Sequence, residues 1–283
     1  MTESPYRLRA SFLSGSRGLL FGLWVLPQEN RGSTGVLLVP PFAEEMNRSR
    51  HMLSLQARAL AEAGFRTLIL DLFGTGDSAG EFAEASVETW LRDLSTGLSA
   101  LSDEGCTCVV IVAVRFGALL ASRLAVATAS TRIGGFVLWQ PVQTGSAFMT
   151  QFLRLRLAAD LATGGQSITV KGLQEELCQG RSVDVGGYEL SPRLYADIQA
   201  MKLSGEMSSP AQPPVTLMEI SAKGGVELSP VMRSLRDRWV DHGVQVTVRK
   251  IEGDPFWQTP EITLAPALFG STVEAVRHME GVI

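Results

Sequence analysis

Apolar stretches of strand length alternate with amphipathic stretches of helical length along most of the chain. Cys106–Val114 is a nearly unbroken apolar run rich in β-branched residues, which predicts a strand covered on both faces of a sheet. Phe116–Ala129 follows directly with apolar residues at helical spacing, so a sharp turn joins a strand to a helix here. We expect the rest of the chain to be built around this unit.

The same alternation recurs on both sides of this unit. Tyr6–Phe12 and Leu19–Pro27 predict an N-terminal hairpin, because a turn rich in glycine and serine separates them. Further strands are predicted at residues 35–39, 66–72, 134–141, 215–221 and 244–251, and helices at residues 48–64, 86–101, 229–243 and beyond 260. Strands that alternate with helices predict an α/β fold, here a mostly parallel, doubly wound sheet of eight strands with right-handed crossovers.

The alternation breaks between residues 142 and 214. We interpret residues 142–214 as a helical cap inserted after the sixth strand, and residues 1–141 and 215–283 as the core domain. Helices are predicted within the cap at residues 147–162, near 173–178 and at 193–201. The first cap helix has a wide apolar face that includes Phe148 and Phe152. Such a face is typical of burial against the core, but it also suits an acyl pocket or a partner contact.

The turn in the central unit has an unusual residue at its centre. Ala113-Val114-Arg115-Phe116-Gly117 has the frame of the Gly-x-Ser-x-Gly nucleophile elbow, with small residues at both ends. Arg115 cannot lose its proton near neutral pH and therefore cannot attack a carbonyl carbon. A guanidinium at a helix N-terminus favours binding of an anion or carboxylate. The alternative is a structural ion pair with a nearby glutamate.

In chain order, these features resemble the α/β-hydrolases. The hairpin, the loop Asp71-x-x-Gly74-x-Gly76-x-Ser78, the elbow frame and the cap all occur in the order found in that superfamily. More narrowly, three segments are similar to the second of two hydrolase families associated with the exosortase A system. These are Pro40–Asn47 (PPFAEEMN), Leu138–Pro141 (LWQP) and Phe152–Arg156 (FLRLR). The resemblance implies a hydrolase fold and a link to bacteria that export an extracellular polysaccharide.

The catalytic triad of such hydrolases is not complete in this sequence. A serine hydrolase of this fold needs a histidine after the last strand, and residues 252–260 contain none. The three histidines, His51, His242 and His278, are elsewhere, and the only acid in the loop after residue 220 is Glu227. Two weak alternatives are Ser78 or Ser49 as a relocated nucleophile with His51 as its base. Ser78 is more simply a turn residue.

Charged, polar and aromatic residues follow the predicted strands and should converge at the carboxyl edge of the sheet. One interpretation is a buried salt-bridge network that replaces a lost active site. The other is a binding pocket for a polar ligand such as a sugar or an acyl derivative, with the tryptophans stacking on a ring. The candidate ligand-binding residues are Arg115, Glu44, Glu45, Asn47, Asp77, Gln140, Trp139 and Trp257.

Composition narrows the classes of function. The net charge is −4 and no basic stripe occurs, so we predict no nucleic-acid partner. The three cysteines lack zinc-ligand spacing, and we predict no metal and no cofactor. No segment is long enough to span a bilayer and no basic, apolar leader begins the sequence, so we expect a cytoplasmic protein.

Three functional hypotheses follow. In the first, the chain keeps the hydrolase fold, lacks the standard triad and binds a small-molecule ligand, with a protein of the polysaccharide or exosortase system as a partner. In the second, it is an active hydrolase, esterase or acyltransferase that uses a non-standard site. In the third, it is an interaction scaffold, whose pocket would be filled by side chains. Arg115 at the elbow favours the first hypothesis.

Overall fold

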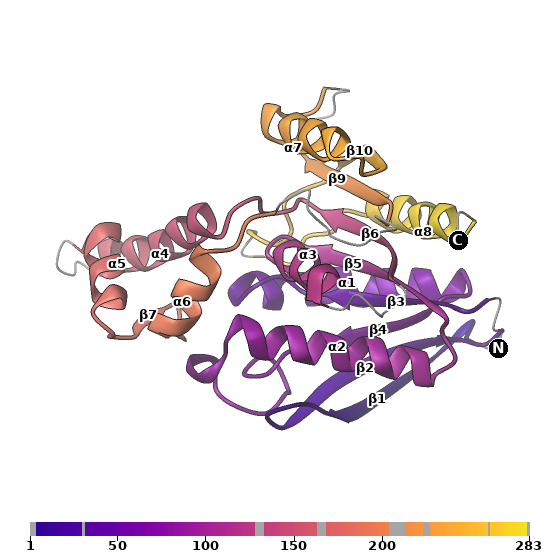
Figure 1. Ribbon diagram of the computed structural model, residues 1–283, viewed down its shortest axis with the longest axis horizontal. Helices are drawn as coiled ribbons and strands as arrows, with labels where there is room; N and C mark the ends of the chain where they lie inside the picture. The colour runs from indigo at the N-terminus through magenta and orange to yellow at the C-terminus, as the bar shows by residue number, and fades with distance from the viewer. Residues whose placement is uncertain are drawn as a thin grey trace.

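The centre of the fold is an eight-stranded sheet (Figure 1). The computed structural model describes residues 4–29, 32–127, 133–162, 168–203, 213–222, 227–259 and 261–281. Within the sheet, β2 is antiparallel to both neighbours and all other adjacent strands are parallel. In sheet order, the strands are β1 (Tyr6–Ser14), β2 (Leu19–Pro27), β4 (Arg66–Leu70), β3 (Thr34–Val39), β5 (Cys108–Val114), β6 (Ile133–Trp139), β9 (Val215–Ser221) and β10 (Val246–Glu252). The predicted mostly parallel α/β sheet of eight strands, with its N-terminal hairpin, is confirmed.

Two apolar cores lie on opposite faces of this sheet because side chains alternate along each strand. Leu37 and Ile111 belong to the core on one face, whereas Leu38 and Val112 belong to the core on the other. The first face is covered by α2 (Val87–Asp103), α3 (Gly117–Ala127) and α7 (Pro230–Asp241), and the second by α1 (Glu44–Glu62) and α8 (Ala267–Glu280). None of the helices in the described ranges is long and apolar enough to cross a membrane.

The central strand begins two residues later than predicted. Cys106 does not enter the ladder, because its N–H donates to the carbonyl oxygen of Leu101 at the end of α2. Pairing with β3 starts at Cys108, opposite Thr34. The following helix, predicted to reach Ala129, is α3 and is described to residue 127, so its predicted last two residues lie outside the described residues.

The elements between β6 and β9 project away from the sheet (Figure 1). They are α4 (Gly145–Ala162), α5 (Val170–Cys178), β7 (Val183–Val185), β8 (Tyr188–Leu190) and α6 (Pro192–Gln199). The outgoing and returning segments lie together, since Gly145 N–H donates to Met201 O and Leu203 N–H donates to Gln143 O, both at 2.8 Å. We call residues 145–203 the cap. The predicted division into core and cap stays a prediction, and the returning residues 204–212 lie outside the described residues.

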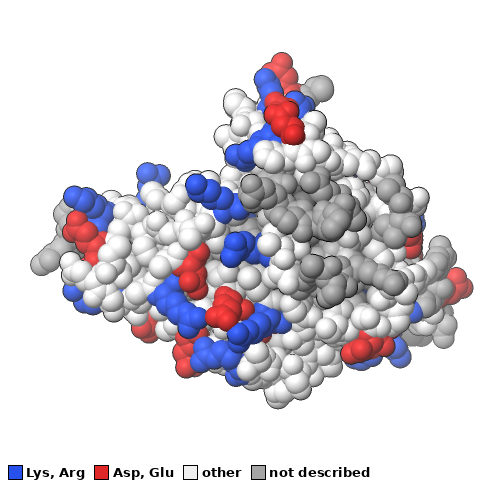
Figure 2. Space-filling view, in the orientation of Figure 1, with Lys and Arg blue, Asp and Glu red and all other residues white. Residues whose placement is uncertain are grey.

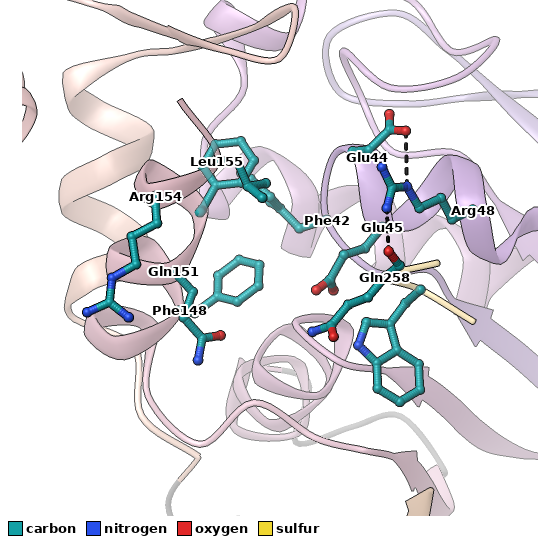
Figure 3. A pocket seen from close by; sticks show the side chains of 11 residues that line it. Phe42, Glu44, Glu45, Arg48, Phe148, Gln151, Arg154, Leu155 and Gln258 are labelled. Carbon is teal, nitrogen blue, oxygen red and sulfur yellow. Dashed lines mark hydrogen bonds and ion pairs between the residues drawn. The ribbon is translucent and has the colours of Figure 1, made fainter. Parts of the chain in front are cut away.

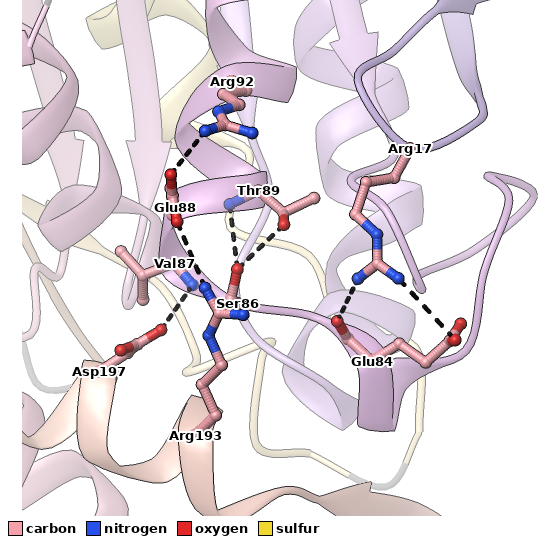
Figure 4. Close-up of polar contacts among 9 residues, drawn as sticks. All are labelled: Arg17, Glu84, Ser86, Val87, Glu88, Thr89, Arg92, Arg193 and Asp197. Carbon is pink, nitrogen blue, oxygen red and sulfur yellow. Dashed lines mark hydrogen bonds and ion pairs between the residues drawn. The ribbon is translucent and has the colours of Figure 1, made fainter.

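Charged side chains join the cap to α2. Arg193 of α6 pairs with Glu88 at 3.3 Å, and Asp197 accepts a hydrogen bond from Val87 N–H at 3.3 Å (Figure 4). A short 3-10 turn, η1 (Phe82–Glu84), precedes α2 and is held by Arg17, which donates to Glu84 O at 2.7 Å. Figure 2 shows basic and acidic side chains gathered on this part of the surface.

Candidate functional site

Three non-glycine residues with positive φ lie at the carboxyl ends of neighbouring strands. Ala43 (φ 51°), Arg115 (φ 53°) and Gln140 (φ 42°) come just after β3, β5 and β6. No other non-glycine residue in the described ranges has a positive φ. Residues other than glycine rarely adopt this backbone conformation, and those that do cluster at functional sites. The backbone therefore marks this end of the sheet as the candidate site.

Arg115 stands at the centre of a tight turn between β5 and α3. Its N–H donates to Trp139 O at 3.0 Å, and its carbonyl oxygen accepts from Val142 N–H at 3.2 Å. Gly117 lets α3 start close to β3, because a Cβ there would lie 2.9 Å from two backbone oxygens at the end of β3. Strand, turn and helix thus have elbow geometry, with an arginine in the central position.

The Arg115 guanidinium is held by groups from three other strand ends. Its Nη2 lies 3.2 Å from Glu45 Oε1, and its Nε lies 3.3 Å and 3.4 Å from the two Glu45 oxygens. Nη1 donates to Gln140 O at 3.4 Å, and the group lies over the Trp257 ring, 5.3 Å from its centroid. The ion pair is mostly buried, with side-chain exposures of 12% for Arg115 and 19% for Glu45.

Burial and neighbouring charges shift the pKa of Glu45 in opposite directions. Desolvation raises the pKa of its carboxyl group, while Arg115 and, more weakly, Arg48 lower it. Desolvation is the larger effect, so the pKa of Glu45 lies above its ordinary value. A carboxyl group of raised pKa beside a cavity is a functional-site candidate, although structural ion pairs produce the same signature.

A second polar network extends from the first turn of α1 to the cap and to the loop after β10. Glu44 Oε1 accepts from Arg48 Nε at 3.2 Å, and Arg48 Nη1 donates to Gln258 O at 2.6 Å (Figure 3). Asn47 Nδ2 donates to Tyr188 OH of β8 at 2.8 Å and to Glu44 Oε2 at 3.3 Å. These bonds fix the rim of the site and connect it to the cap.

A cavity of about 440 Å³ lies between α4 of the cap and the loops after β3 and β10 (Figure 3). Aromatic rings join its two walls, since Phe42 packs edge-on against Phe148 and Phe152 with centroid distances of 5.6 Å and 5.0 Å. Its lining is Phe42, Glu44, Glu45, Arg48, Phe148, Gln151, Phe152, Arg154, Leu155, Trp257 and Gln258. In the described ranges, no group of three or more His, Cys, Asp or Glu side chains is placed to hold a metal ion.

Comparisons with known proteins identify the architecture. No family model and no curated protein matches the chain. The esterase Est1E of Butyrivibrio proteoclasticus, in its structure with ferulic acid, matches with a TM-score of 0.68 at 15% identity, over 96% of this chain and 98% of that one. An esterase of Pyrococcus furiosus matches with a TM-score of 0.56 at 16% identity, over 97% and 91%. This is the α/β-hydrolase fold.

In an α/β-hydrolase fold, the elbow presents the nucleophile and the loop after the last strand presents the histidine. Here the elbow presents Arg115, and residues 252–260 carry no histidine. That loop instead contributes Trp257 and Gln258 to the cavity. His242 lies at the end of α7, where its Nδ1 is 2.7 Å from Arg238 O.

The structure brings four of the predicted ligand-site residues together: Arg115, Glu45, Trp257 and, through its carbonyl oxygen, Gln140. Arg115 does not itself line the cavity but contacts Glu45 and Trp257, which do. The Gln140 side chain is directed to the next strand, since its Oε1 accepts from Ile220 N–H at 2.8 Å. That these residues bind a ligand stays a prediction.

Five of the eight predicted residues do not line the cavity, and two of these, Trp139 and Asp77, have side chains directed away from it or exposed in another turn. Trp139 is completely buried in the core on the α1 and α8 face, where its Nε1 donates to Thr272 Oγ1 at 3.1 Å. Asp77 is exposed in the turn after β4, and its backbone N–H donates to Asp71 Oδ2 at 3.0 Å. Neither is among the residues that line the cavity.

The weak catalytic candidates are not paired with each other. Ser78 Oγ donates to Asp71 O at 2.6 Å and accepts from Phe21 N–H at 2.8 Å, so both of its hydrogen-bonding roles serve the turn. His51 is exposed on α1, and no hydrogen bond joins it to Ser78 in the described ranges. Ser49 is fully buried in α1 and its Oγ has no described partner.

Several lining residues were not singled out from the sequence. Phe42 directly follows Pro40-Pro41 at the end of β3, a position that could have indicated it. Gln151 lies on α4 beside Leu155, which belongs to the apolar face that also suits an acyl pocket. Arg48 and Gln258 carry no local signal, because their contact spans 210 residues.

Proposed function

We propose that this protein binds a small organic ligand, with an acyl or aromatic part, in the cavity between α4 and the core. The observation that carries the proposal is the cavity itself, whose volume of about 440 Å³ falls within the range of about 300–1,000 Å³ typical of ligand sites. The cavity is open although the elbow beside it presents an arginine. A scaffold with a filled pocket is the less favoured alternative.

The lining favours an acyl or aromatic ligand over an unsubstituted sugar. Five of the eleven lining side chains are apolar or aromatic, and they form much of the wall on both the cap and the core side. Gln151 on α4 and Gln258 in the loop after β10 supply side-chain amides on opposite walls of the cavity (Figure 3). The structurally similar esterase Est1E binds ferulic acid, an aromatic acid, which makes such acids the first probes to try.

Ordinary serine hydrolysis is not part of the proposal. Arg115 replaces the nucleophile, and its side chain is engaged by Glu45, Gln140 and Trp257. Loss of the triad residues lowers the rate of such enzymes by about 10⁶. We therefore expect no labelling by a fluorophosphonate probe and no turnover of short or long p-nitrophenyl esters.

Calorimetric titration tests the ligand proposal. We expect ferulic acid and medium-chain fatty acids to bind more tightly than a free hexose. Leu155→Trp should fill the mouth of the cavity and weaken binding by about tenfold or more, a loss of about 1.4 kcal/mol. Val240→Trp is the matched control, since Val240 on α7 is similarly exposed (52% against 54% for Leu155) and does not line the cavity. Equal binding by both variants, or no binding by any probe, would contradict the proposal.

A second candidate function rests on Glu45. Its carboxyl group lines the cavity and has a raised pKa, as expected for a general acid or base. An enzyme of this kind would turn over p-nitrophenyl esters in the wild type and lose that activity in Glu45→Gln. Turnover that survives Glu45→Gln would exclude Glu45 as the base.

The narrower association with exosortase and extracellular polysaccharide is a proposal supported by three sequence segments alone. A cytoplasmic location and a protein partner from the same system belong to that proposal. Deletion of the gene in its host should lower the amount of extracellular polysaccharide. Unchanged polysaccharide would separate this protein from that system while leaving the ligand proposal intact.

A further inference from the structure

The outer edge of the sheet is a long, regular strand. β1 is the terminal strand and forms an unbroken antiparallel ladder with β2 from Tyr6 to Ser14, and no strand of the described ranges pairs with its other side. It contains no proline and no bulge. Such an edge offers a row of free backbone donors and acceptors and is a template for pairing with another strand.

One face of this edge is apolar and exposed. Leu8 and Phe12 are 50% and 58% exposed, and Ala10 between them is also exposed. Side chains two apart share a face of a strand, so these three residues form one stripe. On β2, Leu19 is 52% exposed and lies opposite Ser14, which continues the stripe on the same face.

The two charges of β1 lie on its other face. Arg7 and Arg9 alternate with the apolar stripe and therefore point to the opposite side. Arg9 forms an ion pair with Glu104 of the α2 C-cap, and its guanidinium lies over the Trp24 ring, 4.8 Å from the centroid. The apolar stripe is thus free of the charges that commonly protect edge strands.

We propose that β1 pairs with β1 of a second copy of this chain, antiparallel and about a two-fold axis at Ala10. Ala10 is the central residue of Tyr6–Ser14, so this register pairs all nine residues of the strand. It places Leu8 opposite Phe12 of the second copy, and Phe12 opposite its Leu8. The contact is isologous and joins two eight-stranded sheets into one continuous sheet.

Other registers are less favourable. A shift of the axis to Arg9 places the two Arg9 side chains directly opposite each other, and like charges in that position are destabilising. A shift to Ser11 leaves Phe12 opposite Ala10 and shortens the ladder. An axis between two residues would set side chains of opposite faces against each other. The symmetry of Leu8 and Phe12 about Ala10 is what makes a second copy the best partner for this strand.

Sedimentation velocity over a concentration series tests the dimer. A single strand pairing is a small interface, so we expect a dissociation constant on the order of micromolar. Phe12→Lys and Leu8→Lys should each raise that constant by about tenfold or more, because they place a charge in the apolar stripe. Val231→Lys is the control: Val231 is 63% exposed on α7, which packs on β10 at the opposite edge of the sheet.

Disulfide crosslinking tests the register independently of affinity. In a Cys178→Ser background, Ala10→Cys should give a covalent dimer under mild oxidation, because directly opposed Cα atoms lie about 4.5–5.5 Å apart, within disulfide range. Ser14→Cys should not, since the two Ser14 positions would be about 26 Å apart. A monomer at all concentrations, a dimer insensitive to Phe12→Lys, or faster crosslinking through Ser14→Cys would each overturn the proposal.

Discussion

Two carboxyl groups near the strand ends, Glu45 and Asp93, have pKa values raised by burial but are held in different ways. Glu45 follows β3, faces the cavity and pairs with Arg115. Asp93 is fully buried on α2, where its Oδ2 accepts from Phe73 N–H at 2.9 Å in the loop after β4. Burial raises the pKa of Asp93 to about 6, and its Oδ1 has no partner in the described ranges.

The two carboxyl groups differ in what surrounds them: one is closely packed and the other faces a cavity. At Asp93 the chain is closely packed, since Trp90 Nε1 also donates to Phe73 O at 3.0 Å and α2 thereby holds both backbone groups of Phe73. At Glu45 a cation from another strand end offsets the charge, and open space remains beside it. A raised pKa alone therefore does not mark a functional site. At Glu45 the proposed ligand site rests on the cavity and on the counter-charge of Arg115 as well.

The largest expected effect comes from removing the counter-charge. Arg115→Ala leaves the mostly buried Glu45 without its cation, and we expect the free energy of unfolding to fall by about 3 kcal/mol. Urea denaturation of the wild type and the variant measures this loss. The double variant Arg115→Ala with Glu45→Gln should be more stable than Arg115→Ala alone, because the uncompensated charge is gone. Equal stabilities of these two variants would show that the ion pair is not the cause.

Asp93 should make the free energy of unfolding fall as the pH rises, because burial raises the pKa of its carboxyl group. A carboxyl group whose pKa is raised on folding adds stability below its unfolded value of 3.8, and this stability is lost as the pH rises through about 6. We expect the loss to be on the order of 2–3 kcal/mol. The measurement is the free energy of unfolding of the wild type relative to Asp93→Asn at pH 4 and pH 7.5. The free energy of unfolding of the wild type should fall relative to that of the variant at the higher pH. A difference that does not change with pH would contradict the assignment.

A smaller effect tests how closely the elbow approaches β3. Gly117→Ala would place a Cβ 2.9 Å from two backbone oxygens, so we expect a loss of about 1–2 kcal/mol in unfolding free energy. Gly270→Ala within α8 is the matched control, because nothing lies within 4 Å of its Cβ. The control should gain up to about 1 kcal/mol from helix propensity. If both variants are stabilised, the close approach that sets Arg115 against Glu45 is not required.

The sheet could be predicted from sequence because its central strands are apolar on both faces. Alternation of side chains then assigns Leu37 and Leu38 to different cores without further information. The same rule explains where the site prediction falls short. Trp139 is the last residue of β6, and its position in the alternation directs it to the α1 and α8 face. The direction of Trp257, in a loop, depends on tertiary contacts.

Polar contacts between residues far apart in the chain could not be predicted from the sequence either. The sequence predicts pairing of Arg115 with a nearby glutamate as one alternative, and Glu45 lies in the first turn of α1, after the neighbouring strand β3. The bond from Arg48 to Gln258 spans 210 residues, and Tyr188 reaches Asn47 across 141. No local pattern encodes such contacts, because they arise only when the cap and the loop after β10 meet the first turn of α1.

The smallest expected effect is on hydrolysis, where Arg115→Ser should create no esterase. The variant would restore a serine to an elbow of suitable geometry, with a positive φ of 53° at residue 115 and Gly117 two residues later. The loop after β10, residues 252–260, holds no histidine to take its proton, and loss of the base lowers the rate of such enzymes by about 10⁶. Assays with p-nitrophenyl esters and a fluorophosphonate probe, compared with Arg115→Ala, measure this. Labelling of Arg115→Ser that disappears in Arg115→Ser with Glu45→Gln would instead show that Glu45, freed from its cation, serves as the base. The difference between the two carboxyl groups would then extend from binding to catalysis.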